Sequence, residues 1–180
     1  MKILDNFLDE EEFEPIQSYF FYKLPWMYWD SIVGNMGDEK EDKDCYQFIH
    51  TFRSARDPYL QVNNSEHCHI IKPVLQKLAP WIVLRVKANL RPISHRHVHS
   101  AFHRDLGDAG QLTAIYYLNT CNGYTMFKDG TKVESVENRM LIFDGNELHC
   151  GASCTDEKAR IVLNLNYLPG SLSDGTKYIP

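Results

Sequence analysis

From residue 81 to residue 168 the chain alternates short apolar segments with turn residues, and this alternation constrains the fold more than any other feature. The segments are rich in β-branched and aromatic residues, and proline, glycine or Asp-Gly pairs follow most of them. Short strands at this spacing are typical of an all-β sandwich or barrel. The segments are WIVLRVKANL (81–90), QLTAIYYLNT (111–120), YTMF (124–127), TKVESV (131–136), RMLIF (139–143) and RIVLNLNYL (160–168).

The first 80 residues have a different pattern and are expected to be mainly helical. DEEEFEPIQSYFFYKL (9–24) is amphipathic, with Asp9 as its N-cap and acidic residues in its first turn. SEHCHIIKPVLQKLAP (65–80) predicts a second helix capped by Ser65, with only a turn before Pro73. PWMYWDSIVG (25–34) is expected to be extended and GDEKEDKD (37–44) to be a solvated loop. We expect one domain over 1–180, helical over about 1–80 and with a β core over about 81–168.

Composition limits the class of protein. A chain of 180 residues is long enough for one domain with its own core, and its net charge of −5 argues against a nucleic-acid partner. No apolar run approaches the roughly 20 residues of a membrane span, and the first 15 residues lack the apolar run of a signal peptide. Five cysteines without framework spacing predict reduced thiols and a cytoplasmic protein.

SHRHVHSAFHRD (94–105) contains four of the eight histidines and one aspartate. Because residues two apart on an extended chain point to the same face, His103 and Asp105 could bind one ion together. A single HxD is weak evidence, and a hydrogen-bonded surface pair is its simplest explanation. Residues further along the chain are therefore needed to distinguish a metal site from a surface pair.

GNELHCGASCTDEKARIVLNLNY (145–167) supplies those residues. If the strands on either side pair antiparallel, His149 and Arg160 come close together. Two histidines and one carboxylate form the ligand set of non-haem Fe(II) oxygenases, and an arginine can hold a carboxylate by two hydrogen bonds. The alternative for Arg160 is a surface ion pair with Asp156 or Glu157.

Several stretches in this order resemble the 2-oxoglutarate/Fe(II)-dependent oxygenase superfamily, on its prolyl 4-hydroxylase-like branch. They are RVKANLRP, FHRD, LTAIYYLN, NGYTMFKDG, NRMLIFDGNELHCG and RIVLNLNY, which together extend over about residues 84–167. The chain also resembles small oxygenases of marine bacterial viruses. The resemblance implies a double-stranded β-helix, that is, a jelly-roll or cupin-like core, with flanking N-terminal helices. It also implies the cytoplasm of a bacterial or virus-infected bacterial cell.

The resemblance implies roles for individual residues. His103, Asp105 and His149 match the iron ligands, and Arg160 and Tyr117 match positions that hold the 5-carboxylate of 2-oxoglutarate. Asn89 aligns with a strand position that can contact the other end of the cosubstrate. The implied reaction is the hydroxylation of an unactivated C–H with release of succinate and CO2, with ascorbate as a candidate reductant. The substrate would be a peptide or protein, with a peptidyl proline as one candidate, or a small molecule.

Other interpretations stay open at this point. His95, His97 and His99 could be solvated or lid residues, substrate contacts or a second metal site. A zinc site could use His149 with Cys150 and Cys154. A cupin-like metal-binding protein without oxygenase activity would need no 2-oxoglutarate, and a degenerate binding module would have lost the chemistry.

Strand periodicity predicts which residues share a face. In 112–117, Tyr116 and Tyr117 point opposite ways, so one is expected to face the barrel interior. In the last strand, Arg160, Asn164 and Asn166 share a face, where the asparagines could orient ligand groups or be satisfied by backbone. Tyr124 stands where relatives often have a second glycine and could narrow the pocket mouth or cover the hairpin.

Overall fold

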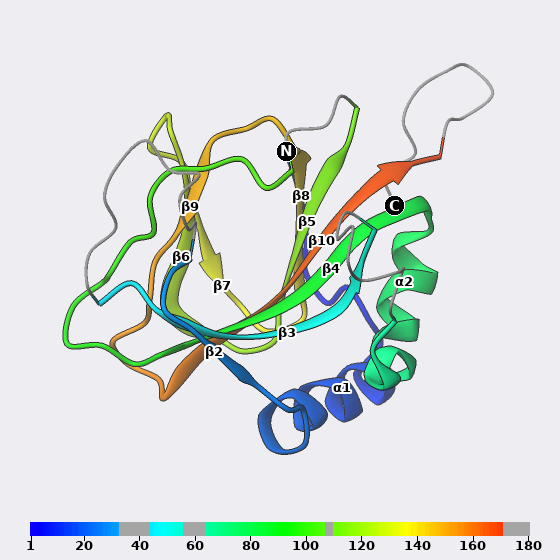
Figure 1. Cartoon of the computed structure of the whole chain (residues 1–180), viewed down its shortest axis with the longest axis horizontal. Helices are drawn as coiled ribbons and strands as arrows, with labels where there is room; N and C mark the ends of the chain where they lie inside the picture. Colours follow the sequence, from blue (N-terminus) through cyan, green and yellow to red (C-terminus); the bar gives the residue numbers. More distant parts are fainter. Residues whose placement is uncertain (33–43, 56–63, 107–109, 171–180) are drawn as a thin grey trace.

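The computed structural model describes residues 1–32, 44–55, 64–106 and 110–170, and the predicted loop over 37–44 lies outside them except for Asp44. The described strands form two antiparallel sheets, of order β1-β8-β5-β10-β4-β3-β2 and β7-β6-β9. Figure 1 shows α1 and α2 on one side of the large sheet and the small sheet on the other. The elements are β1 (Lys2–Leu4), α1 (Glu10–Tyr22), β2 (Met27–Trp29), β3 (Gln47–Ser54), the 3-10 helix η2 (Glu66–Ile71), α2 (Lys72–Leu78), β4 (Pro80–Pro92), β5 (Leu112–Tyr117), β6 (Cys121–Phe127), β7 (Lys132–Ser135), β8 (Arg139–Asp144), β9 (His149–Gly151) and β10 (Ala159–Pro169).

One hydrophobic core lies between the helices and the large sheet. The buried face of α1 contributes Phe13, Ile16 and Phe20, which pack in one cluster with Leu163 and Leu165 of β10. This arrangement follows from periodicity, because a helix and a strand can each present one apolar face to the other. The same cluster contains Val74 and Leu78 of α2.

A second, smaller core lies between the two sheets. It contains Tyr117 and Val162 of the large sheet and Phe127 and Val133 of the small one. Tyr116 belongs instead to the helix-side core, so the two tyrosines do face opposite ways, as predicted. The inner face of β10 therefore lies between the sheets, where a site can be enclosed.

The N-terminal part contains strands as well as helices; β2 lies in the segment 25–34 that was expected to be extended, whereas β1 and β3 were not predicted. It contributes β1, β2 and β3, and these three strands form both edges of the large sheet. The pattern of β3, QFIHTFRS, mixes polar and apolar residues on both faces, so its strand identity depends on pairing with β4. The two predicted helices are confirmed, and the second begins with η2 before Pro73.

The helix caps were predicted with mixed success. The Ser65 hydroxyl accepts a hydrogen bond from the backbone N–H of His67 at 3.1 Å, so Ser65 is a side-chain cap. Asp9 occupies the N-cap position of α1, but its side chain makes no capping bond and its carbonyl accepts from Phe13 instead. Among the described residues, no helix is long and apolar enough to cross a membrane.

Candidate metal centre

Two histidines from distant parts of the chain meet between the sheets. His103 and His149 form an isolated antiparallel bridge, in which each backbone N–H donates to the carbonyl of the other residue, at 3.0 and 3.1 Å. Paired residues of a bridge project their side chains to the same side, and the two imidazole rings lie 4.7 Å apart. The backbone pairing therefore brings together two ligands separated by 46 positions in the sequence.

The two imidazoles present the same nitrogen to one place. Nδ1 of His103 lies 3.0 Å from the carbonyl of Ala101, and Nδ1 of His149 lies 3.1 Å from the carbonyl of Glu147. A carbonyl can only accept, so Nδ1 has the proton and Nε2 has the free lone pair. Burial, followed by the nearby His149, lowers the pKa of His103, which favours the neutral form that binds a metal.

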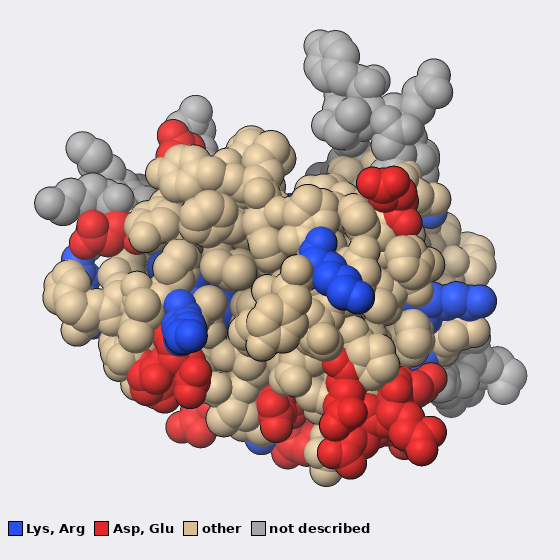
Figure 2. Space-filling model, turned by 90° about the horizontal axis from the view of Figure 1, so that it is seen from below, with Lys and Arg blue, Asp and Glu red and all other residues tan. Residues whose placement is uncertain are grey.

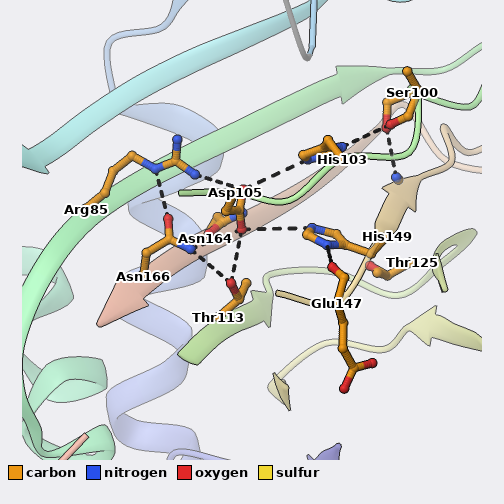
Figure 3. A network of polar contacts seen from close by, with 12 residues as sticks. Arg85, Ser100, His103, Asp105, Thr113, Thr125, Glu147, His149, Asn164 and Asn166 are labelled. Atoms are coloured by element: carbon orange, nitrogen blue, oxygen red, sulfur yellow. Dashed lines mark hydrogen bonds and ion pairs between the residues drawn. The ribbon is translucent and has the colours of Figure 1, made fainter. Parts of the chain in front are cut away.

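Asp105 completes a group of three ligands (Figure 3). Its carboxylate oxygens lie 3.9 Å from Nε2 of His103 and 3.9 Å from Nε2 of His149. One ligand atom from each of these residues lies within 4.8 Å of the other two. The set of two imidazoles and one carboxylate fits a divalent transition metal with open positions, so the residues present suit Fe(II). Elsewhere in the described chain, no comparable group of His, Cys, Asp and Glu side chains occurs.

A network of donors surrounds the Asp105 carboxylate (Figure 3). Arg85 donates to Oδ1 at 2.8 Å, and Asn164, Asn166 and Thr113 donate to Oδ2 at 3.1, 3.1 and 3.3 Å. Burial by itself would raise the pKa of Asp105, but the positive charge of Arg85 and the hydrogen bonds hold it well below its usual range. The carboxylate is therefore ionised and fixed in orientation before any metal binds.

This network answers the question about the asparagines of β10 and adds residues that the sequence did not indicate. Asn164 and Asn166 are not satisfied by backbone; they orient Asp105. Arg85 and Thr113 were not singled out. Arg85 could have been found from β4, where Arg85, Lys87 and Asn89 alternate and therefore share one face of the strand.

Arg160 lies at the other end of the same pocket and is buried, so the alternative of a surface ion pair is wrong. Its Nε donates to Ser135 at 2.7 Å and its Nη2 to Thr125 at 3.1 Å. Tyr117 supports it, since the guanidinium lies over the phenol ring at 5.5 Å and the Tyr117 hydroxyl donates to Thr125 at 2.9 Å. Tyr117 thus lies behind Arg160 and Thr125 and is not part of the pocket lining.

One pocket joins the two ends of the site. Its lining includes the three candidate ligands, Arg160, Thr125 and Asn89. The Oδ1 atom of Asn89 is buried and makes no hydrogen bond with any described residue, so it is available to a ligand. The structure thus brings Asn89 and Arg160 to the wall of the cavity that contains the metal group.

The remaining histidines do not join this group. His97 Nδ1 lies 2.8 Å from the carbonyl of Ser153, and His99 Nε2 lies 2.8 Å from the hydroxyl of Tyr124. Tyr124 itself is not in the pocket lining, so of the two interpretations the structure favours a cover over the hairpin. The structure gives no support to a second metal site at these histidines, because the described chain has no such cluster there.

The structure gives no support to a zinc site that uses the cysteines near His149. The group of described His, Cys, Asp and Glu side chains that could hold a metal together contains His149 but neither Cys150 nor Cys154. The Cys154 thiol donates to the carbonyl of Glu157 at 3.2 Å. All five cysteines are free thiols.

Comparison with known proteins adds evidence on the fold. No protein-family model matches the chain, and no curated protein matches its sequence. Among solved structures, a prolyl hydroxylase from Trichoplax adhaerens, in complex with a peptide of the hypoxia inducible factor oxygen degradation domain, is 16% identical with a TM-score of 0.62. That match covers 93% of this chain and 82% of the other.

Two further structures agree with this match. The viral collagen prolyl hydroxylase of Paramecium Bursaria Chlorella virus-1, in a 2OG complex, is 12% identical with a TM-score of 0.56, over 92% of this chain and 93% of that one. A 2OG-Fe(II) oxygenase family protein from Burkholderia pseudomallei is 10% identical with a TM-score of 0.61, over 92% and 84%. At these identities the likeness shows the fold, and it confirms the predicted double-stranded β-helix of the 2-oxoglutarate oxygenases.

Proposed function

We propose that the protein is a 2-oxoglutarate- and Fe(II)-dependent dioxygenase that hydroxylates an unactivated C–H, with release of succinate and CO2. The single observation that supports this most is the convergence of His103, Asp105 and His149 in a pocket that ends at a buried arginine. A metal site alone would fit a cupin-like binding protein. Arg160 favours the oxygenase, because a buried guanidinium facing a pocket suits a dicarboxylate cosubstrate.

The proposed roles follow from the contacts. His103, Asp105 and His149 would hold Fe(II), which when bound supplies the chemistry of dioxygen activation. Arg85 and the β10 asparagines keep the Asp105 carboxylate ionised and oriented toward that position. Preorganised ligands of this kind lose little freedom when the metal binds.

At the far end of the pocket, Arg160 would bind the 5-carboxylate of 2-oxoglutarate together with Thr125. Tyr117 would act there through its ring beneath Arg160 and its hydrogen bond to Thr125. Burial raises the pKa of Tyr117, so the phenol stays protonated and remains a donor. Asn89 would contact the cosubstrate between the two ends, since it lines the pocket and its buried Oδ1 has no hydrogen-bond partner among the described residues.

The substrate is open within this proposal. The prolyl hydroxylases of the same fold support a peptide substrate, and the Trichoplax adhaerens structure holds a peptide. A peptidyl proline or another protein side chain is therefore one candidate, and a small molecule is the other.

Steady-state turnover of 2-oxoglutarate tests the proposal. Arg160→Ala should raise the KM for 2-oxoglutarate by about tenfold or more, because a charge-assisted pair contributes roughly 1.5–3 kcal/mol. Metal affinity, measured separately by titration, should change little. The matched control is Arg139→Ala, which removes an arginine that pairs with Asp5 on the surface, away from the pocket. A 2-oxoglutarate requirement that is the same in Arg160→Ala and wild type would refute the role of Arg160.

A further inference from the structure

Two of the five cysteines lie beside each other outside the pocket. Cys121 begins β6, and Cys154 lies in the connection between β9 and β10. Their side chains are in hydrogen-bonding contact with each other. Both are buried, with exposed fractions of 6% for Cys121 and 0% for Cys154. Neither thiol belongs to the candidate metal group or to the lining of the pocket.

The residues that follow the two cysteines hold them together. The side-chain amide of Asn122 donates to the Thr155 hydroxyl at 2.7 Å and accepts from the backbone N–H of Thr155 at 2.9 Å. The backbone N–H of Asn122 also donates to the carboxylate of Asp156 at 3.0 Å. Because each cysteine is covalently joined to one member of the Asn122–Thr155 pair, the two sulfur atoms stay close to each other. Such placement favours a disulfide, which forms without backbone movement only between cysteines that are already close.

Cys121 has the chemistry of a reactive thiol. The hydrogen bond with Cys154 lowers the pKa of Cys121, and the positive charge of Arg160 acts in the same direction. The thiolate is the form of cysteine that attacks an oxidant. Cys68 offers the contrast, because burial raises its pKa although Cys68 is more exposed than Cys121. Cys121 therefore has a larger thiolate fraction than Cys68 at neutral pH.

Cys121 is connected to the cosubstrate end of the pocket through Ser135. The two residues are register partners on β6 and β7, and the Ser135 side chain makes a hydrogen bond to Cys121. The Ser135 hydroxyl oxygen also accepts from Nε of Arg160 at 2.7 Å. Ser135 is buried, so water cannot easily replace a partner that it loses. A change at the Cys121 sulfur therefore affects the support of Arg160.

We propose that Cys121 and Cys154 form a redox-sensitive pair that a peroxide converts to a disulfide, and that this disulfide weakens the binding of 2-oxoglutarate. The second part rests on the proposed function, whereas the first part does not. An S–S bond of about 2.0 Å is shorter than a contact between two thiols, so the Cys121 sulfur moves toward Cys154. Ser135 then loses a hydrogen-bond partner, and Arg160 is held less firmly.

The oxidation takes two steps and consumes one molecule of hydrogen peroxide. The Cys121 thiolate attacks one peroxide oxygen and the O–O bond breaks, which gives a sulfenic acid and a hydroxide that takes up a proton to become water. The Cys154 sulfur then attacks the sulfenic sulfur, so that the S–S bond forms and the S–O bond breaks. The leaving oxygen takes the Cys154 proton and departs as a second water. The two thiols lose two electrons, and the peroxide is reduced by the same two.

Charge and burial favour a small, neutral oxidant. The chain has a net charge of −5, and Figure 2 shows Asp and Glu side chains gathered along one edge of the face seen from below. An acidic protein does not attract anionic oxidants such as glutathione disulfide. The low exposure of Cys121 also excludes bulky oxidants. Hydrogen peroxide is small and uncharged, so neither limit applies to it.

Peptide mass spectrometry and 2-oxoglutarate titration of the wild-type protein test both parts. The protein is treated with hydrogen peroxide before metal is added, because Fe(II) and peroxide together generate radicals. Peroxide is then removed, and half of the sample is reduced again with dithiothreitol. Digestion of the oxidised half should give two peptides joined through Cys121 and Cys154, and fragmentation distinguishes Cys154 from Cys150 in the same peptide. After both halves are loaded with Mn(II), the oxidised half should bind 2-oxoglutarate about threefold to tenfold more weakly, the effect of one neutral hydrogen bond.

Three variants assign the roles of the thiols. In Cys154→Ala, oxidation of Cys121 should stop at the sulfenic acid, which dimedone labels. Cys121→Ser should give neither the disulfide nor the label, and its 2-oxoglutarate affinity should not respond to peroxide. Cys68→Ala is the matched control, since Cys68 packs against the helix-side core and its thiol donates to the carbonyl of Phe52. This control should respond to peroxide as the wild type does.

The two parts fail in different ways. Absence of the Cys121–Cys154 disulfide from the peroxide-treated wild type would overturn the proposal, as would a disulfide that leaves the 2-oxoglutarate affinity unchanged. If the reduced protein with Mn(II) does not bind 2-oxoglutarate at all, the proposed oxygenase function fails together with the second part. Mass spectrometry would still decide the first part on its own.

Discussion

The position of the Arg160 side chain depends on Gly123, which has no side chain of its own. A Cβ added at Gly123 would lie 2.6 Å from Cδ of Arg160, which is closer than real Cβ contacts are, and 3.1 Å from the carbonyl oxygen of Ala152, which is tighter than most. Arg160 cannot move away easily, because Ser135 and Thr125 hold its guanidinium. Gly123 therefore makes room for the arginine on which the cosubstrate proposal depends.

We predict that Gly123→Ala weakens 2-oxoglutarate binding by about tenfold or more, since displacement of a charged anchor by a fraction of an ångström loses its hydrogen bonds. Metal affinity should stay within about twofold of wild type, because the change is remote from the three ligands. Titration of each ligand separately, by calorimetry, measures both quantities. A variant with normal 2-oxoglutarate affinity would show that Arg160 tolerates displacement or does not bind the cosubstrate.

The sequence predicts the role of a single residue only where the residue type and its place in the order of motifs are characteristic of one kind of chemistry. The HxD, the distal His149 and Arg160 were found because their residue types and order suggest metal and carboxylate binding. Arg85 and Thr113 were missed because an arginine or a threonine in a strand has many roles, and only the fold shows that both reach Asp105. The actual contact of Tyr117, with Thr125, also required the folded geometry.

At the scale of elements, the turn between β7 and β8 attaches the N-terminal segment to the sheet. Asn138 in this turn has a left-handed backbone with φ of 57°. Its side-chain amide donates to the carbonyl of Leu8 at 2.8 Å, and its Oδ1 accepts from the backbone of Leu8 at 2.9 Å and from Tyr116 at 2.7 Å. One side chain thus joins the segment before α1, the turn and β5.

Asn138→Ala should lower the free energy of unfolding by about 2–4 kcal/mol, since it leaves buried polar groups unpaired and strains a non-glycine residue at positive φ. Asn138→Gly loses the same hydrogen bonds but not the backbone conformation, so it should be less destabilising by about 1 kcal/mol. Urea denaturation followed by circular dichroism gives both values. An alanine variant as stable as the wild type would mean that water replaces these bonds at no cost.

Elements differ in how far the sequence specifies them. Apart from β9, which was not predicted, the strands from β4 onward and both helices have the periodicity of their class, and the structure confirms them. β3 and the short edge strands β1 and β2 do not, because their hydrogen bonds with β4, β8 and β3 determine them more than local sequence does.

At the scale of the whole molecule, the helix-side core and the core between the sheets differ in what they support. Phe20 is fully buried in the core between α1 and the large sheet. Phe143 is buried between the sheets, and its ring lies 4.8 Å from that of His149, edge to face. The helix-side core stabilises the sheet, and the core between the sheets also supports a metal ligand.

Phe20→Leu and Phe143→Leu should each reduce the free energy of unfolding by about 1–3 kcal/mol, as is usual for imperfect repacking of a core. Only Phe143→Leu should also weaken metal binding, by up to about tenfold, because the Phe143 ring packs against the ligand His149. Residues that hold a metal ligand in position also affect the affinity for the metal. Denaturation and Mn(II) titration of both variants separate the two effects. Equal losses of metal affinity would indicate that the cores act as one unit.

The measurement that tests the central claim most directly is the anaerobic addition of Fe(II) and then 2-oxoglutarate to the purified protein, followed by visible absorption. We expect a charge-transfer band that needs both components and disappears in Asp105→Ala, because that change removes the carboxylate ligand and its charge. A protein that binds Fe(II) but gives no band with 2-oxoglutarate would contradict the oxygenase assignment and favour a cupin-like metal-binding protein.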